Sequence, residues 1–147
     1  MKKLIVSIMV ALVVMASGAL AQENKNAVKK EQAKHKVVIQ LSTNDAQQWN
    51  FLMMNIKHLK AGWGENVEIE VVAYGPGVDM LMSGSTQKDK VAEFKKQGVS
   101  FMACENTMKV RGITKEEILK DAGFVPMGVG ELVLKQDQGW GYFKAGF

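Results

Sequence analysis

The chain has 147 residues, a formal charge of +4 and 47% hydrophobic residues, which suits one packed domain. Its start predicts a signal peptide, because a basic Met1–Lys3 precedes an apolar stretch and a small-residue end that finishes at Ala21. Cleavage after Ala21 removes two lysines and lowers the charge to +2, which gives no reason to expect nucleic acid or an anionic membrane as a partner. We therefore expect a periplasmic or secreted protein whose leader is residues 1–21.

The mature chain divides into a polar tail, residues 22–35, and one α/β domain, residues 36–147. The tail is rich in lysine and poor in apolar residues, so we expect it to be solvated. Cys104 is the single cysteine, so no internal disulfide forms and stability comes from packing. No segment after the leader is long and apolar enough to span a bilayer, so we predict a protein that does not span the membrane.

The first half of the domain alternates strand and helix. Residues 36–41 are rich in β-branched side chains and predict a strand, and residues 42–45 then offer helix N-caps. Apolar residues recur at three- and four-residue spacing over residues 49–60, which predicts an amphipathic helix. Residues 67–74 predict a second strand. We expect its start to be solvated, because Glu68 and Glu70 alternate with apolar residues there.

The second half continues the alternation. The predicted elements are a turn at Gly75-Pro76-Gly77, a short helix over 78–82, a helix over 87–97, a strand over 99–103, a helix over 115–121, an extended piece over 124–126, a helix over 127–136 and a strand over 140–145. Capping boxes are predicted to open two of these helices, Thr86 with Asp89 for the second and Thr114 with Glu117 for the third. This order predicts a three-layer α/β/α fold with a mostly parallel sheet of about five strands.

Ligand sites in open parallel sheets gather beyond the carboxyl ends of the strands. Three loops follow predicted strands at that edge, and they supply the candidate ligand-binding residues Thr43, Asn44, Gly75, Gly77 and Asn106, together with Cys104. Asp45 and Asp79 lie at the same edge, where helix capping accounts for them.

Cys104 ends the third predicted strand and is the candidate catalytic residue. The reactive form of cysteine is the thiolate, and an ordinary thiol titrates near ~8.5. If residues 105–108 open a helical turn, their unpaired amides stabilise the anion, and Arg111 adds positive charge nearby. A buried cysteine packed beside Phe101 is the alternative, and the residues alone leave both interpretations open.

The sequence offers Cys104 no evident catalytic base and no metal. His35 lies in the predicted tail and His58 on the first helix, and neither is placed to take a proton from the thiol. One cysteine and two scattered histidines match no metal-ligand spacing, so we expect neither a metal nor a cofactor. Trp63 and Trp140 stand between glycines and are candidate subunit-interface residues.

Three segments resemble the DsrE/DsrF-like family of small sulfur-relay proteins: Val71-Val-Ala-Tyr-Gly-Pro-Gly-Val78, residues 99–108 around the cysteine, and residues 125–132 with Gly139-Trp140. The most specific element is Cys104 followed at seven and eight residues by Arg111-Gly112. The resemblance covers residues 37–144 and implies a three-layer α/β fold, dimers, trimers or hexamers, and a persulfide-carrying Cys104.

Two hypotheses follow, and whether the protein is an enzyme stays open. The first is a periplasmic sulfur-handling protein that carries sulfane sulfur on Cys104 as a persulfide, with a homo-oligomer and a sulfur donor or acceptor protein as partners. The alternative is a non-catalytic oligomeric module that binds a small ligand beyond the strand ends, with Cys104 lining the pocket.

Overall fold

The computed structural model of the protein describes residues 35–146. The predicted signal peptide, its cleavage after Ala21 and residues 22–34 of the tail lie outside the described residues. His35, which the sequence placed in the tail, is the first residue of a strand, and its ring stacks on Trp63 with 4.1 Å between centroids. His35 therefore belongs to the domain.

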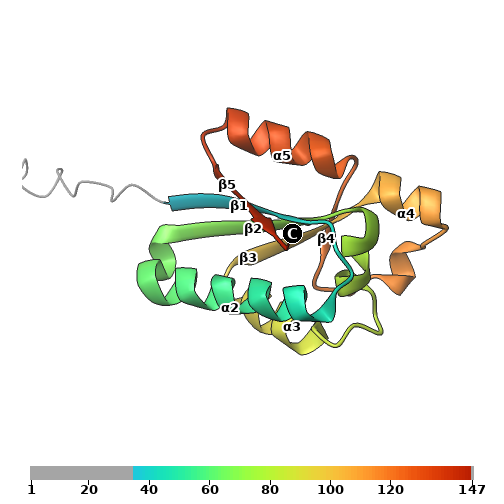
Figure 1. The fold of residues 1–147 in the computed structure, drawn as a ribbon, viewed down its shortest axis with the longest axis horizontal. Coiled ribbons are helices and arrows are strands. Elements are labelled where there is room, and N and C mark those ends of the chain that lie inside the picture. The colour runs from blue at the N-terminus through green and yellow to red at the C-terminus, as the bar shows by residue number, and fades with distance from the viewer. Residues whose placement is uncertain (1–34, 147) are drawn as a thin grey trace, which may run out of the picture. The chain divides into compact units, whose positions relative to one another are not determined.

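Five strands form one sheet in the order β4-β3-β2-β1-β5 (Figure 1). They are β1 (His35–Leu41), β2 (Val67–Ala73), β3 (Val99–Cys104), β4 (Gly123–Val125) and β5 (Gly141–Ala145). Every neighbouring pair is parallel, so the predicted sheet is confirmed. The loops that follow β1, β2 and β3 consequently share one edge of the sheet.

Helices cover both faces of this sheet, which confirms the three layers (Figure 1). One face carries α2 (Ala46–Trp63) and α3 (Lys88–Lys96), the other carries α5 (Gly128–Asp137), and α4 (Glu105–Arg111) follows β3 at its carboxyl end. Three short 3-10 helices are η1 (Gly64–Asn66), η2 (Gly75–Leu81) and η3 (Lys115–Glu117). Within residues 35–146, none of the helices has the length and apolar character needed to cross a membrane.

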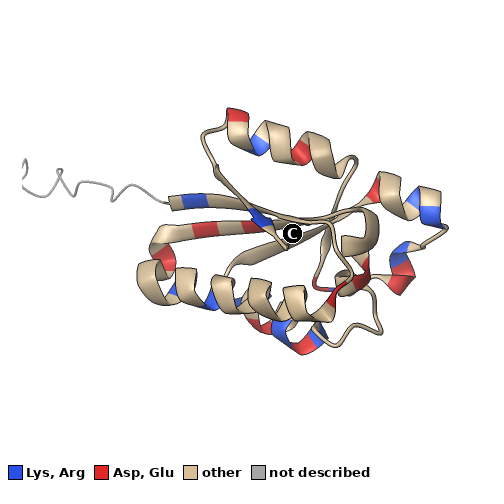
Figure 2. Cartoon of the chain, viewed as in Figure 1, with Lys and Arg blue, Asp and Glu red and all other residues tan. Residues whose placement is uncertain are grey.

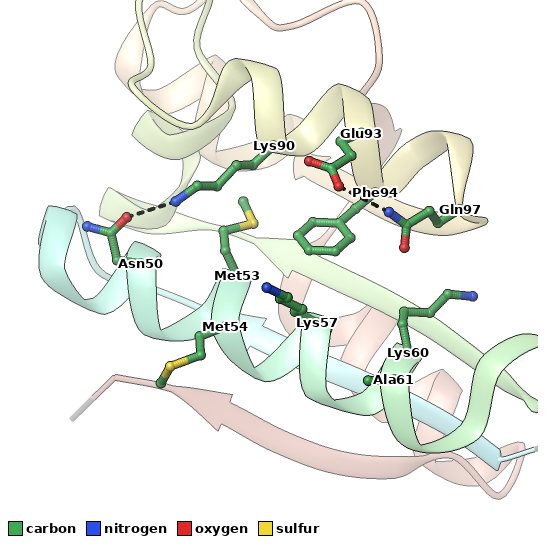
Figure 3. Close-up of a pocket in the computed structure, with 10 residues that line it drawn as sticks. All are labelled: Asn50, Met53, Met54, Lys57, Lys60, Ala61, Lys90, Glu93, Phe94 and Gln97. Atoms are coloured by element: carbon green, nitrogen blue, oxygen red, sulfur yellow. Dashed lines mark hydrogen bonds between the residues drawn. The ribbon is translucent and has the colours of Figure 1, made fainter.

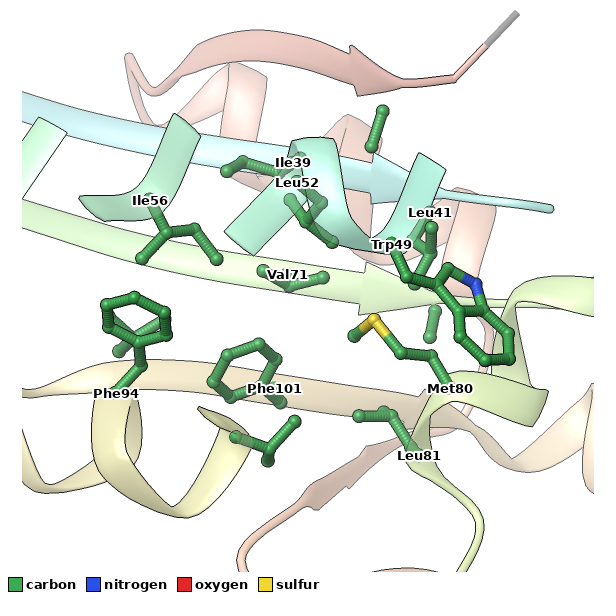
Figure 4. Close-up of a cluster of buried hydrophobic side chains, with 14 of the residues drawn as sticks. Ile39, Leu41, Trp49, Leu52, Ile56, Val71, Met80, Leu81, Phe94 and Phe101 are labelled. Carbon is green, nitrogen blue, oxygen red and sulfur yellow. The ribbon is translucent and has the colours of Figure 1, made fainter. Parts of the chain in front are cut away.

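Two hydrophobic clusters hold the layers together. The larger fills the space between the sheet and the α2–α3 layer, where Leu52 of α2 lies beside Ile39 and Phe101 lies beyond Val71 (Figure 4). The smaller lies under α5 and includes Leu132 and Trp140. Trp140 is only 8% exposed, so its side chain packs inside the domain and does not offer the expected subunit-interface surface. Trp63 is 40% exposed, so its side chain is accessible to another subunit.

Glu70 was expected to be solvated, and this was wrong. It is 7% exposed because α5 covers its face of the sheet, and its carboxylate lies 2.8 Å from the Lys135 nitrogen. A strand pattern of alternating acidic and apolar residues does not reveal a helix, 65 residues further on, that brings a cation to the polar face.

Two helix starts also differ from prediction. The capping box of Thr114 and Glu117 is present, but its helix is the three-residue η3, because Ile118 turns away to bridge Met82. The predicted box at Thr86 is wrong. Helix α3 starts at Lys88 without a side-chain cap, and the Ser85 hydroxyl accepts the preceding N–H of Gln87 at 3.1 Å.

Gly77 packs so closely against the end of β1 that a side chain has no room. A Cβ at this position would overlap the carbonyl group of Leu41, which is held in place because it accepts the N–H of Tyr74 at 3.1 Å.

We predict that Gly77→Ala lowers the free energy of unfolding by about 2–4 kcal/mol in urea titrations. The matched control Gly84→Ala, where a Cβ meets no atom within 4 Å, should change it by less than ~1 kcal/mol. Similar losses in both variants would contradict this packing role.

Candidate functional site

Cys104 is both the last residue of β3 and the N-cap of α4. Side chains alternate between the two faces of a strand, and Ala103 belongs to the core beneath α2 and α3. The Cys104 side chain therefore points toward the α5 layer, where it is 4% exposed.

The N-termini of two helices meet at the Cys104 sulfur. The amide of Gly128, the first residue of α5, donates to Sγ at 3.2 Å, and the amide of Thr107 in the first turn of α4 donates at 3.4 Å. Amides in the first turn of a helix have no partner inside the helix and favour a negative charge. Gly128 is a glycine of necessity, because a Cβ there would lie 2.8 Å from the Cβ of Tyr74.

The Thr107 hydroxyl completes the surroundings of the sulfur. Its oxygen accepts the N–H of Gly75 at 2.9 Å, which leaves its own hydrogen free to donate to Sγ. The amide of Asn106 donates to the carbonyl of Pro126 at 3.2 Å and so holds the loop before α5 against α4. Segments after β2, β3 and β4 are thus fastened to one another around the thiol.

These contacts favour the thiolate. Burial by itself raises the pKa of Cys104, but hydrogen bonds from the side chain and amide of Thr107 and from the amides of Gly128 and Asn106 outweigh it. The pKa of the Cys104 thiol consequently lies below its ordinary value, because each of these donors binds the anion more strongly than the neutral thiol.

Arg111 and Gly112 support the site without touching the sulfur. The Arg111 guanidinium lies 2.6 Å from the Asp79 carboxylate and donates to the carbonyl of Gly75 at 3.2 Å. Asp79 therefore pairs with an arginine in addition to its place in η2, where the sequence suggested only capping. Gly112 ends α4 in the left-handed conformation, with φ of 67°. The Cys…Arg-Gly spacing thus fixes the length of α4 and ties it to the loop that orients Thr107.

The other candidate residues divide into two groups. Gly75 and the backbone of Asn106 lie in the Cys104 network, while Gly77 is occupied by packing against β1. Thr43 instead serves the start of α2, where its carbonyl accepts the ring N–H of Trp49 at 2.9 Å, and Asn44 is exposed. Among residues 35–146, no hydrogen bond joins Thr43 or Asn44 to the Cys104 network.

The expected contribution of the amides of residues 105–108 is borne out by the Thr107 amide, but sequence reasoning missed the Thr107 hydroxyl and Gly128. Thr107 carried a usable signal, because it is the third residue after a cysteine that ends a strand and begins a helix. Gly128 carried none, since only the folded chain brings a residue 24 positions away to the sulfur.

Two cavities lie away from the thiol, and Cys104 lines neither. The first, about 680 Å³, is a groove between α2 and α3 with a floor of Met53 and Phe94 and with Lys57, Lys60 and Lys90 around it (Figure 3). The second, about 490 Å³, is lined by Val37, Asn55, His58, Leu59, Gly62, Trp63 and Phe143. In the described part of the chain, no group of three or more His, Cys, Asp or Glu side chains could hold a metal ion.

A buried ion pair fixes α5, and with it Gly128, on the sheet. The Lys135 nitrogen lies 2.8 Å from Glu70 and 3.6 Å from Glu131, and it stands 4.4 Å from the centroid of the Trp140 ring. Burial raises the pKa of Glu70 despite this pairing. Burial works to lower the pKa of Lys135, but the hydrogen bond and attraction to Glu70 outweigh it and raise that pKa.

Lys135→Met should destabilise the protein at pH 7 by about 3 kcal/mol, because it leaves the Glu70 carboxylate buried without its cation. A carboxyl whose folded-state pKa is raised stabilises the fold below that pKa and loses this contribution as pH rises through it. The deficit of Lys135→Met relative to wild type should therefore shrink as the pH falls from 7 toward 5.

The matched variant Glu70→Gln leaves Lys135 paired with Glu131 and should cost less, with little pH dependence over this range. Urea unfolding at several pH values measures both effects. Equal costs with parallel pH profiles would contradict the unpaired, buried Glu70 carboxylate as the cause of the loss.

Thr107→Ala should raise the pKa of Cys104, because it removes the hydroxyl that donates to the thiolate. Thr107→Ser keeps a hydroxyl and should leave the midpoint near that of wild type. The ultraviolet absorbance of the thiolate, titrated with pH and corrected with Cys104→Ser, measures the midpoint directly. An unchanged midpoint in Thr107→Ala would exclude the hydroxyl as a donor to the sulfur.

Comparisons with known proteins agree with this architecture. Residues 34–145 match the model of the DsrE/DsrF-like family. The chain is similar to the solved structure of MTH1491 from Methanobacterium thermoautotrophicum, a protein of unknown function, with 35% identity and a TM-score of 0.72 over 75% of this chain and 98% of that one. It shares its fold with BT1422 from Bacteroides thetaiotaomicron, also of unknown function, at 18% identity and a TM-score of 0.61 over 79% and 99% of the two chains.

No curated protein gives a significant match. Since the family model spans nearly the whole described domain, the chain belongs to the DsrE/DsrF-like family.

Proposed function

We propose that this protein carries sulfane sulfur in the periplasm as a persulfide on Cys104. The observation that supports this most directly is the convergence of the Gly128 and Thr107 amides on Sγ, which lowers the pKa of the thiol. A carrier needs a thiolate but no catalytic base. Membership of a family with sulfur-relay members agrees with this chemistry.

Loading is a thiol exchange with a persulfide donor. The Cys104 thiolate attacks the terminal sulfur of the donor R–S–SH, a new bond forms between Sγ and that sulfur, and the donor's S–S bond breaks. The electron pair of that bond leaves on the donor as R–S⁻. Cys104 then holds S–SH, and a thiolate of an acceptor removes the terminal sulfur by the same exchange. No external oxidant or reductant is consumed.

The donor reaches the sulfur when the loop between β4 and α5 moves. Cys104 is 4% exposed, and the Gly128 amide and the Pro126 carbonyl are the contacts that hold this loop over it. The loop consists of Pro126 and Met127, and Met127 is 58% exposed, while Gly128 and Gly130 lie in the first turn of α5 directly after it. A partner that engages Met127 is well placed to shift the loop and expose the thiol.

The proposal includes export and assembly. A cleavable signal peptide ending at Ala21 delivers the protein to the periplasm, where a donor or acceptor protein exchanges sulfur with it. We also expect a homo-oligomer, in keeping with the family. Nothing in the charge of the mature chain suggests nucleic acid.

The burial of Cys104 favours a second candidate, a non-catalytic module that binds a small ligand. Both described cavities lie on α2, away from the thiol, so such a ligand would occupy a site that Cys104 does not line. In that case Cys104 is the cap of α4 and a packing residue. Cys104→Ala would then leave ligand binding and cellular phenotype unchanged.

Exposure of the mature protein to polysulfide or a low-molecular-weight persulfide should add the mass of one sulfur atom to Cys104. Intact-mass analysis of native protein measures this, and dithiothreitol should reverse it. Cys104→Ser is the matched control and should gain nothing, since serine also caps the helix and preserves the fold.

The rate of thiol alkylation separates the two candidates. Labelling of the native protein at neutral pH agrees with a carrier whose loop opens. A thiol that stays unmodified by persulfide and is alkylated only after unfolding, with the fold intact by circular dichroism, would overturn the carrier and leave the ligand module.

A further inference from the structure

The strand β5 leaves one of its edges unpaired. It pairs with β1 on one side, and within residues 35–146 no strand or loop forms backbone hydrogen bonds with its other side. A free edge presents a row of N–H and C=O groups that readily accept another strand. The opposite end of the sheet is the three-residue β4, which offers a much shorter edge.

Large aromatic side chains flank this edge on both faces of the sheet. Phe143 is aligned with Ile39 and so faces the α2 layer, whereas Tyr142 is aligned with Val38 and faces the α5 layer. Phe143 is 41% exposed and Tyr142 is 46% exposed. Natural edge strands usually avoid such residues, because they promote pairing with other chains.

The apolar surface extends from β5 onto α2. We call it the β5-edge surface. It consists of Phe51, Met54 and Trp63 on α2 and Phe143 on the same side of the sheet, together with Tyr142 on the α5 side, each 40–46% exposed. Met54 lies at the boundary of this surface, because it also lines the groove between α2 and α3, and its side chain extends to the side away from α3 (Figure 3). The 490 Å³ cavity opens between Trp63 and Phe143 in the same region.

The area of this surface suits a protein partner. If a fully exposed side chain of this size offers ~200 Å², the five together expose roughly 400 Å². That is about half of the ~800 Å² that each partner buries in a stable complex. The backbone edge of β5 and the neighbouring polar side chains can supply the remainder.

We propose that β5 pairs antiparallel with β5 of a second copy of this chain, about a two-fold axis at Phe143. The two sheets then join into one sheet of ten strands. This inference assigns an interface to the homo-oligomer proposed above, and it does not depend on the sulfur chemistry. In the strand order, β3 is separated from β5 by β2 and β1, so Cys104 lies roughly 14 Å from the edge and stays free of the contact.

The sequence of β5 is complementary to itself in this register. Phe143 lies opposite Phe143 of the second copy, and Tyr142 lies opposite Lys144, so the only cation of the strand meets an aromatic ring and not another cation. The two small residues at the ends, Gly141 and Ala145, face each other. A second copy therefore satisfies the apolar, aromatic and charged groups of the strand at once.

The competing surface is the outer side of α5, where Val129, Val133 and Leu134 are each more than half exposed. It lacks a backbone edge, so it provides a matched control.

Phe143→Glu should raise the dissociation constant of the dimer of mature protein at least about tenfold, because it places two carboxylates face to face. Sedimentation equilibrium measures this constant. Val133→Glu should leave the constant unchanged.

Disulfide trapping tests the register. In a Cys104→Ser background, Phe143→Cys should form an intermolecular disulfide rapidly on mild oxidation, because directly opposed residues lie within disulfide range. Tyr142→Cys should do so far more slowly, since the two copies of this residue are offset by two positions. Both positions are about half exposed, so either variant should fold.

Three results would overturn the proposal. They are a wild-type chain that stays monomeric up to high micromolar concentration, a dimer lost in Val133→Glu but retained in Phe143→Glu, and equal trapping at positions 142 and 143. None of these results bears on persulfide formation at Cys104.

Discussion

The hydrogen bond from the Gly128 amide to the Cys104 sulfur is the contact on which the rest of the site depends. It can form only if α5 lies at one height above the sheet, and three features fix that height. Gly128 lacks a side chain where it crosses Tyr74, Lys135 reaches the buried Glu70, and Trp140 fills the space below the helix. The position of this donor to the thiol therefore depends on the docking of a whole layer, including the contact of Lys135 two helical turns after Gly128.

A second group of contacts acts from the opposite side. Arg111 joins α4 to η2 through Asp79 and the Gly75 carbonyl, and the adjacent Gly75 amide then sets the direction of the Thr107 hydroxyl. Arg111, which belongs to the Cys…Arg-Gly motif, thus positions the η2 segment, and that segment in turn positions the Thr107 hydroxyl beside the sulfur. These contacts explain why the spacing between Cys104 and Arg111 matters even though the guanidinium does not contact the sulfur.

Much of the fold was predictable because it depends on local periodicity. The spacing of Trp49, Leu52 and Ile56 identified α2, and the β-branched runs identified β1 and β2. The position of Cys104 at a strand end also followed from the sequence. What could not be predicted depends on tertiary contacts: Glu70 is buried only because Lys135 returns to it, η3 stops only because Ile118 bridges Met82, and Gly128 reaches the thiol only through the docking of α5. Patterns along the chain contain no information about which distant residues meet.

The presence of one cysteine gives this fold an unusual tolerance of reagents. Small domains that depend on disulfides for stability unfold when a reductant breaks those bonds. Here the two hydrophobic clusters and the α5 ion pair carry the stability, and none of them contains a disulfide. A thiol reductant can therefore act on Cys104 while the scaffold remains folded, because the chain has no cross-link that the reductant could break.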